Sequence, residues 1–401
     1  MPALLNPALF HFDPDVIWVM HCSEGPVPRV GMRAARAWMQ KELRPWDVRW
    51  KEDLVGLPLA VRREAAKLLQ AEGEDITLTA STSTGLQIVA SGYPWQPGDE
   101  VLAPLGEFPT NIWPWKAQSA RGAGFREAAL WEGHRAGAEA WDTTPPGIGD
   151  DPETRLLAAI GPSTRILALS WVRFQDGLKL DLVRLGAGCR ERGVHLVVDG
   201  IQGAGTCLAT TDGLAAFATG GHKGLLAPQG QGVLWTHPGF RRQLVPSGSW
   251  LSVEEAGDFA RPSTDHDRAW LENGERLEAG MPNLLGQAVL LESLRMLNQV
   301  GVLALESHIK ALQWRLLKKL EASSWAPEVR RLQALRDADR LGSILAFHHG
   351  GRGSEALQAF LRKGMRQGLY ASVREGYLRI ALHGFHTEAD VDRVAHWMAT
   401  A

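Results

Sequence analysis

The chain has 401 residues, of which 45% are hydrophobic and 22% are charged, and its formal net charge is −2. A chain of this length and apolar content can bury a large core and a second domain, so a single small module is excluded. Lys and Arg are scattered along the sequence, which excludes the clustered basic surface that binds nucleic acid.

The cysteines and the hydropathy pattern indicate a cytoplasmic protein. Cys22, Cys189 and Cys207 are too few and too widely spaced for a disulfide framework or a closed zinc site, so we expect no metal. The N-terminus lacks a basic stretch followed by a continuous apolar run, and no segment approaches the roughly 20 apolar residues that span a bilayer. We therefore expect no membrane partner.

Strands and helices alternate through the first two thirds of the sequence. Helices are predicted at 28–44 and near 181–192, and short apolar strands at 76–81, 100–105, 166–171, 194–200 and 232–238. This alternation is typical of a mainly parallel sheet covered by helices. The Pro, Gly and Asp-rich segment 143–154 is predicted to be a surface loop.

The pattern changes near residue 284. Two long amphipathic helices are predicted at 284–298 and 302–321, followed by strands at 343–349 and 377–382 and helices near 354–368 and from 387. We therefore expect a large domain over residues 16–283 and a smaller α/β domain that combines residues 1–15 with 284–401.

The strongest chemical signal is a carboxylate at the end of an apolar strand, followed by a lysine in a Gly-rich turn. Asp199 ends the apolar run VHLVVDG, and His222 and Lys223 lie in the Gly-rich turn GGHKG 24 residues later. Ligands in open α/β folds bind beyond the carboxyl ends of strands, where these side chains would meet. Pyridoxal 5′-phosphate (PLP) needs such a pair, because its aldehyde forms a Schiff base with an amine and its pyridine nitrogen needs a carboxylate.

The sequence resembles the class V aminotransferase family of fold-type I PLP enzymes, which includes cysteine desulfurases, kynureninase and isopenicillin N epimerase-like proteins. Seven motifs stand in the family's order: TASTSTGLQIVA, GEFPTNIWPW, LSWVRFQDG, VVDGIQGAG, GGHKGLLAPQG, RLEAGMPN and YLRIALHGFHTEADVD. The resemblance covers nearly the whole chain. It implies an α/β fold whose large domain holds a mainly parallel seven-stranded sheet, a smaller α/β C-terminal domain, and a homodimer.

The resemblance also implies how PLP is held. Lys223 would carry the cofactor and shuttle the proton at the substrate α-carbon, with His222 beside it. Asp199 would pair with the pyridinium nitrogen, and Gln202 would hydrogen-bond the 3′-oxygen. Phe108 takes the position where the family stacks a ring on the pyridine face.

Further residues are expected to hold the phosphate of PLP and the carboxylate of the substrate. Thr82, Ser83 and Thr84 lie between a strand and a helix, where hydroxyls and backbone N–H groups hold a phosphate, although a simple helix cap is the alternative. Arg379 matches the arginine that clamps the substrate α-carboxylate, with a structural salt bridge as the alternative. His383 follows on the same segment and would face the pocket, unless it is a hydrogen-bonded structural histidine.

The sequence departs from the family at several positions. The interval KGMRQGLYASVREGY lacks the loop cysteine with which cysteine desulfurases form a persulfide, and Cys22 is either near the entrance or a buried inert thiol. Gly220 and Met281 replace residues of the phosphate cup, so fewer hydroxyls would reach the phosphate. Unless Ser83 and backbone amides compensate, we expect PLP to bind more weakly than in the family. Phe174 replaces a polar residue of the desulfurases and favours the epimerase-like branch.

Three functions therefore remain. The first is a class V aminotransferase-like enzyme that acts on a small amino acid. The second is a carbon–sulfur lyase, cysteine desulfurase-like enzyme or epimerase, which shares the same removal of the α-proton by Lys223. The third, from another class, is a non-catalytic binding protein that keeps the PLP fold.

Overall fold

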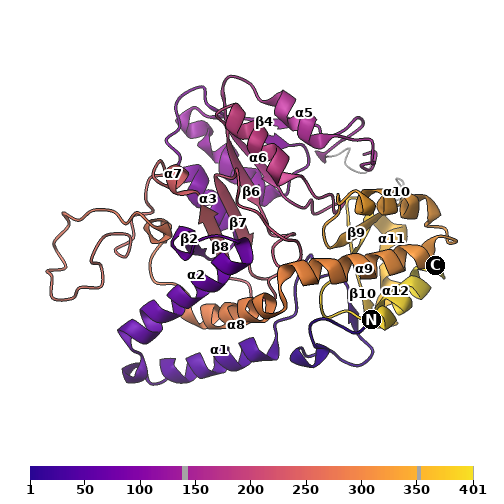
Figure 1. Cartoon of the computed structure of the whole chain (residues 1–401), viewed down its shortest axis with the longest axis horizontal. Helices are drawn as coiled ribbons and strands as arrows, with labels where there is room; N and C mark the ends of the chain where they lie inside the picture. The colour runs from indigo at the N-terminus through magenta and orange to yellow at the C-terminus, as the bar shows by residue number, and fades with distance from the viewer. Residues whose placement is uncertain (138–142, 350–353, 401) are drawn as a thin grey trace.

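The computed structural model describes residues 1–137, 143–349 and 354–400. Within these ranges seven strands form a central sheet in the order β2-β8-β7-β6-β5-β3-β4, and all neighbouring pairs are parallel except those that involve β8 (Figure 1). This confirms the mainly parallel seven-stranded sheet. The strands are β2 Ile76–Thr79, β3 Glu100–Pro104, β4 Gly124–Ala128, β5 Thr164–Ser170, β6 His195–Asp199, β7 Ala216–Gly220 and β8 Gly232–Thr236.

The inner strands are apolar on both faces because each face packs on a separate core. Along β6, Leu196 and Val198 belong to one buried cluster and Val197 to the other, as the two-residue period of a strand requires. Helices therefore cover the sheet on both sides. The shorter helices of this region are α3 Thr82–Gly92, α4 Trp113–Lys116, α5 Pro152–Ala159, α6 Leu182–Glu191 and α7 Pro238–Arg241.

The predicted loop at 143–154 is wrong at its C-terminal end. Asp151 caps α5 by accepting a hydrogen bond from the Thr154 backbone N–H at 3.0 Å, so the helix begins at Pro152. Thr143 is also buried, although it was expected on the surface. The Pro-Gly composition identified the turn but did not show where the cap lies.

A second α/β part contains smaller sheets and the C-terminal helices. β12 pairs antiparallel with both β9 and β11, and β1 pairs parallel with β10. The strands here are β1 Ile17–Trp18, β9 Ile344–His348, β10 Leu369–Tyr370, β11 Ser372–Arg374 and β12 Tyr377–Ala381. The remaining long helices are α1 Arg29–Glu42, α2 Gly56–Leu69, α8 Leu284–Val300, α9 Val302–Leu320, α10 Ala326–Asp337, α11 Ser354–Met365 and α12 Glu388–Ala399.

The chain start packs on the C-terminal part. The backbone N–H groups of Leu4 and Leu5 both donate to the Gly384 carbonyl at 2.8 Å. Helix α8, in contrast, packs on α1 and α2. The domain boundaries at residues 15 and 283 stay a prediction.

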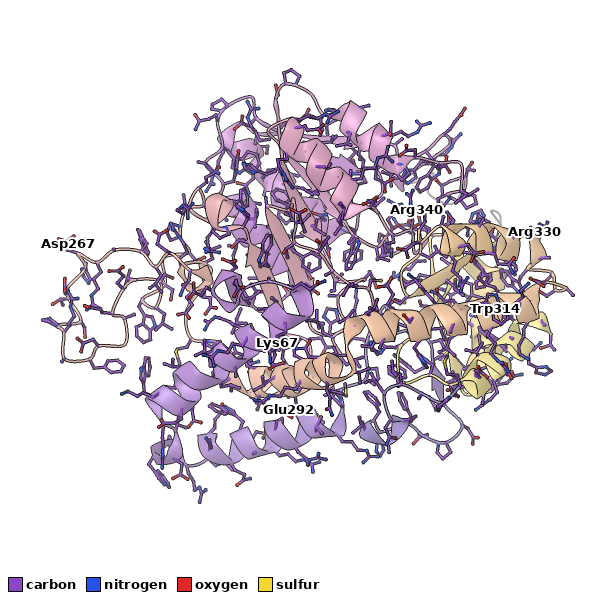
Figure 2. All side chains as sticks on the ribbon, in the orientation of Figure 1. Lys67, Asp267, Glu292, Trp314, Arg330 and Arg340 are labelled. Carbon is purple, nitrogen blue, oxygen red and sulfur yellow. The ribbon has the colours of Figure 1, made fainter. Side chains whose placement is uncertain are left out.

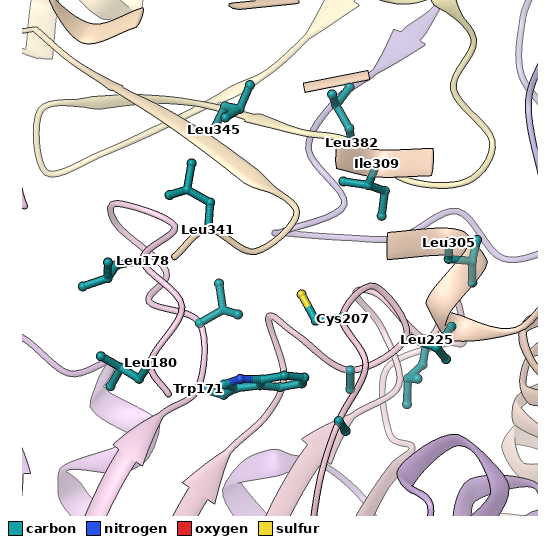
Figure 3. Close-up of a cluster of buried hydrophobic side chains, with 14 of the residues drawn as sticks. Trp171, Leu178, Leu180, Cys207, Leu225, Leu305, Ile309, Leu341, Leu345 and Leu382 are labelled. Atoms are coloured by element: carbon teal, nitrogen blue, oxygen red, sulfur yellow. The ribbon is translucent and has the colours of Figure 1, made fainter. Parts of the chain in front are cut away.

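A continuous apolar cluster joins the two parts. Figure 3 shows Trp171 and Cys207 at the sheet side, facing Leu305 of α9 and Leu341 before β9. In Figure 2 the segment with Asp267 at its tip projects away from the body. No single helix in the described ranges is long and apolar enough to cross a membrane, and the pair α8 and α9, which would suffice together, is bent by 75°.

Candidate active site

A cavity of about 400 Å³ lies beyond the carboxyl ends of the central strands. Eight of the residues predicted for the site line it, and they come from both parts of the chain: Thr82, Ser83, Phe108, Asp199, Gln202, His222, Lys223 and Arg379. A larger groove of about 790 Å³ lies near His195, at the amino end of β6, and contains none of these residues. We therefore assign the chemistry to the smaller cavity.

Lys223 and Asp199 form its charged floor. Asp199 ends β6, and one carboxylate oxygen accepts a hydrogen bond from the Ile201 backbone N–H at 3.0 Å. Burial raises the pKa of Asp199 to about 6, while the Ile201 N–H and the Lys223 charge oppose the rise. Burial lowers the pKa of Lys223, and Asp199 opposes that change. The site therefore holds an amine that loses its proton more readily than a surface lysine, as a nucleophile or proton acceptor requires.

The turn that carries Lys223 is fixed by the N-terminal segment. The Gly25 N–H donates to the His222 carbonyl at 2.7 Å. A Cβ at Gly25 would lie 2.2 Å from the Lys223 carbonyl oxygen, so only glycine permits this approach. Gln202 holds the same segment by donating from Nε2 to the Cys22 carbonyl at 3.0 Å. The Gln202 amide nitrogen has a second N–H, which remains for a ligand.

Phe108 forms one wall of the cavity. Its ring centroid lies 5.7 Å from Lys223 Nζ and 5.1 Å from the Phe174 ring, which meets it edge-on. The ring is 39% exposed, so one side remains open toward the cavity and solvent. A planar aromatic ligand attached near Lys223 would contact this ring.

The start of α3 supplies a polar cradle at one end. Ser81 caps the helix by accepting from the Thr84 N–H at 3.1 Å. Ser83 Oγ lies 2.9 Å from Thr110 Oγ1. Thr82 Oγ1 is buried without a hydrogen-bond partner in the described ranges. An oxygen atom of a bound ligand would supply the hydrogen bond that this hydroxyl lacks.

Thr84 differs from expectation in its placement, whereas Gly220 lies beside the predicted phosphate cradle. Thr84 does not line the cavity, because its hydroxyl turns back to Ser81 Oγ at 3.0 Å. Gly220 is buried, and a Cβ there would lie 3.2 Å from Thr82 Oγ1. The glycine therefore leaves the space beside that hydroxyl open. Met281 is 46% exposed and lies outside the cavity lining.

Arg379, on β12, is a buried cation without an acidic partner. Its Nε donates to Ser372 Oγ at 3.1 Å, Nη1 to the Phe174 carbonyl at 2.6 Å and Nη2 to Ser23 Oγ at 3.3 Å. Across the described residues no carboxylate pairs with it, so the structural salt bridge is absent there. Burial lowers the pKa of Arg379. A buried guanidinium of this kind is a site for an anionic group.

His383 does not reach the cavity. Its side chain is completely buried, with Nε2 3.0 Å from the Gly224 carbonyl and Nδ1 accepting from the Gly384 N–H at 2.8 Å. Both ring nitrogens are occupied, and burial lowers the pKa of His383 to about 4. The expected substrate contact is therefore wrong, and His383 supports the Lys223 turn from behind.

Sequence reasoning missed several lining residues. Glu24 and Arg374 lie at the cavity, and neither stands in a recognisable catalytic pattern. Cys22 also lines it, but its side chain is only 1% exposed, and Sγ lies 3.7 Å from Ser372 Oγ. Glu107, next to Phe108 in the sequence, accepts hydrogen bonds from both the N–H and the hydroxyl of Ser170. The GEFPTN motif therefore contributes a buried carboxyl as well as a ring.

The residues present fit PLP. The unpartnered Thr82 hydroxyl and the α3 N-terminus suit a phosphate, Asp199 suits a protonated pyridine nitrogen, and the Lys223 amine suits the aldehyde. The sequence model of the family described as "Aminotransferase class-V" matches residues 59–394. The chain belongs to the class V aminotransferase family. This family is PLP-dependent, so the cofactor predicted from the sequence is confirmed.

Individual relatives are more distant. A probable cysteine desulfurase of Methanothermobacter thermautotrophicus is 25% identical over 297 residues, which are 72% of this chain and 66% of the relative. The isopenicillin N epimerase of Streptomyces clavuligerus is 26% identical over 400 residues, 96% of this chain and 94% of that enzyme. A solved cystine C–S lyase in complex with its reaction product cysteine persulfide has a TM-score of 0.78 at 23% identity, covering 95% of this chain and 97% of that chain. The last likeness confirms fold-type I.

Proposed function

We propose that the protein is a PLP-dependent enzyme that binds a small α-amino acid through its carboxylate and removes the proton from its α-carbon. The observation that carries the proposal is the buried Arg379, which has no acidic partner among the described residues and faces the same cavity as Lys223 and Asp199. When bound, PLP supplies an electron sink for the α-carbon. Asp199 would hold the pyridine nitrogen protonated, and Arg379 would orient the substrate.

Lys223 is the proposed proton acceptor at the α-carbon. Its lowered pKa, caused by burial, favours the neutral amine that can take a proton. The cavity volume of about 400 Å³ lies near the lower end of the 300–1,000 Å³ typical of ligand pockets, and it must hold cofactor and substrate together. This volume supports a small substrate.

We infer that the reaction after proton removal is elimination from the β-carbon, as in a carbon–sulfur lyase. One relative is a probable cysteine desulfurase and one structural neighbour is a cystine C–S lyase, which supports a sulfur amino acid. Residues 363–377 contain no cysteine, so a loop persulfide is not available there. The overall change converts R–S–CH₂–CH(NH₃⁺)–COO⁻ and water into pyruvate, ammonium and R–SH.

Epimerisation is the second candidate, because the relative aligned over almost its whole length is an epimerase. Transamination, the first function predicted from the sequence, stays a prediction. Both begin with the same proton removal by Lys223 and differ in where the proton returns.

The test is a product analysis of the PLP-loaded protein with L-cysteine, L-cystine, S-methyl-L-cysteine and L-alanine. We expect pyruvate and ammonia from each sulfur amino acid, with sulfide from cysteine, methanethiol from S-methylcysteine and cysteine persulfide from cystine. We expect none of these products from the Lys223→Ala variant. Transamination would instead convert the cofactor to its amine form without ammonia, and epimerisation would produce the D-amino acid. Either result in place of elimination would refute the lyase proposal.

We also propose a cytoplasmic homodimer. The three cysteines are free thiols, which supports a reducing compartment. Trp46 and Phe259 are 76% and 69% exposed, which is unusual for aromatic side chains and supports their burial against a second subunit. Analytical ultracentrifugation would show a dimer, and a monomer would refute this proposal.

A further inference from the structure

The mouth of the active-site cavity carries two opposite charges. Of the residues that line the cavity, the exposed ones are Glu24, Phe108 and Arg374, so they mark the opening, whereas Asp199 and Arg379 are buried at the floor. Neither Glu24 nor Arg374 has a side-chain hydrogen bond or ion pair with any residue in the described part of the chain. Two opposite charges without a side-chain partner in the described ranges therefore lie on the exposed side of this cavity.

The two charges approach the floor from different sides. Glu24 precedes Gly25, whose N–H is bonded to the Lys223 turn, and its charge acts on both His222 and Lys223. Arg374 ends β11, and β11 pairs with the strand that carries Arg379. Burial lowers the pKa of Arg379, and the Arg374 charge lowers it further. The negative group thus lies on the Lys223 side of the mouth and the positive group on the Arg379 side.

The arrangement restricts where a substrate side chain can go. Arg379 would bind the α-carboxylate, and Lys223 would lie at the α-carbon beside the bound cofactor. The substrate side chain would then extend toward the exposed side of the cavity, where Glu24 and Arg374 lie. A distal group with one charge would be attracted by one of them and repelled by the other.

We propose that Glu24 and Arg374 form an outer subsite for a second amino acid head group, so that the preferred substrates carry α-amino acid groups at both ends. The distal carboxylate would contact Arg374 and the distal ammonium Glu24. This inference rests on the proposed function, because it places an amino acid at Arg379. It names the substrate class as bis-amino acids, in which two such heads are joined by a short chain.

The test uses four ligands with the same carbon chain and no sulfur leaving group. L-Norleucine has a neutral end, L-lysine adds a distal ammonium, L-2-aminopimelate adds a distal carboxylate, and LL-2,6-diaminopimelate adds both. Dissociation constants are measured from the change in the visible spectrum of the PLP-loaded protein. An exposed ion pair contributes up to about fivefold in affinity, so we expect diaminopimelate to bind roughly tenfold tighter than norleucine, with the singly charged ligands no tighter than norleucine.

Variants assign the effect to the two side chains. Arg374→Ala and Glu24→Gln should each remove most of the advantage of diaminopimelate over norleucine, with both dissociation constants measured on the same variant. Arg330→Ala serves as the control, because Arg330 is an exposed arginine on α10 (Figure 2) and is not among the residues that line the cavity. Equal binding of diaminopimelate and norleucine, or an advantage that survives both variants, would overturn the outer subsite.

The outcomes separate this inference from the proposed reaction. Selective binding of diaminopimelate without elimination from any sulfur amino acid would refute the lyase and leave the subsite in place. Elimination from S-methylcysteine and cystine at equal kcat/KM, together with equal binding in the ligand series, would refute the subsite and leave the lyase. A protein whose spectrum responds to no amino acid would overturn both.

Discussion

The Arg379→Lys variant tests the proposed carboxylate clamp. An arginine has five N–H donors, and three of those of Arg379 are engaged by Ser372 Oγ, the Phe174 carbonyl and Ser23 Oγ. Two donors remain, one on each terminal nitrogen, which is the geometry that a carboxylate accepts with both oxygens. Lysine keeps the charge but cannot reproduce this fork.

The expected loss follows from these two bonds. A hydrogen bond to a charged group contributes about 1.5–3 kcal/mol, so losing the fork should raise the dissociation constant of an amino acid roughly 10- to 100-fold. The assay is a spectral titration of the PLP-loaded protein with L-norleucine and with 1-pentylamine, which is norleucine without its carboxylate. Pentylamine binding should not change. If Arg379→Lys weakens both ligands equally, the residue supports the fold and does not clamp a carboxylate.

Three further changes have distinct expected results. Thr82→Val should leave the apo-protein at least as stable as wild type, because the Thr82 hydroxyl has no partner in the described structure. The same variant should bind PLP about tenfold more weakly. An unchanged PLP affinity would show that the hydroxyl does not contact the phosphate. Cys22→Ser should retain elimination activity within about threefold, because the thiol is buried; complete loss would make Cys22 a nucleophile. Burial raises the pKa of Glu107 to about 7, so the native chain keeps a proton that the unfolded chain releases above about pH 4.3. The stability of the apo-protein should therefore fall between about pH 4.5 and 7, and urea unfolding of Glu107→Gln should show a shallower fall; an unchanged slope would assign it to another group.

The sequence predicted the parts of the fold that have strong apolar periodicity. Strands β5 and β6 are buried on both faces and read as continuous apolar runs, so they were found. Strand β4 was missed because it is a half-exposed edge strand with the polar sequence GFREA. Strand β7 was missed because its sequence, AFATG, is short and made mostly of small residues. The small residues of β7 let α3 pack closely on this strand. A Cβ at Gly85 of α3 would lie only 3.0 Å from the Ala218 Cβ.

The candidate site was predicted where motifs place residues at strand ends. Lys223 and Asp199 follow neighbouring parallel strands, so their meeting follows from topology. Thr84 could not be separated from Thr82 by sequence, although successive residues of a helix point about 100° apart and cannot all face one ligand. His383 lies beyond the end of β12, where the alternation of a strand no longer fixes the side-chain direction. Among the described residues no carboxylate pairs with Arg379. This depends on which distant segments the fold brings together, so the sequence could not show it.

The central claim is that Lys223 carries PLP. The most direct measurement is borohydride reduction of the PLP-loaded protein, followed by proteolysis and mass spectrometry of the modified peptide. We expect one phosphopyridoxyl group on Lys223 and none at that position in the Lys223→Ala variant. Modification of another lysine in the wild-type protein, or no covalent cofactor at all, would contradict it.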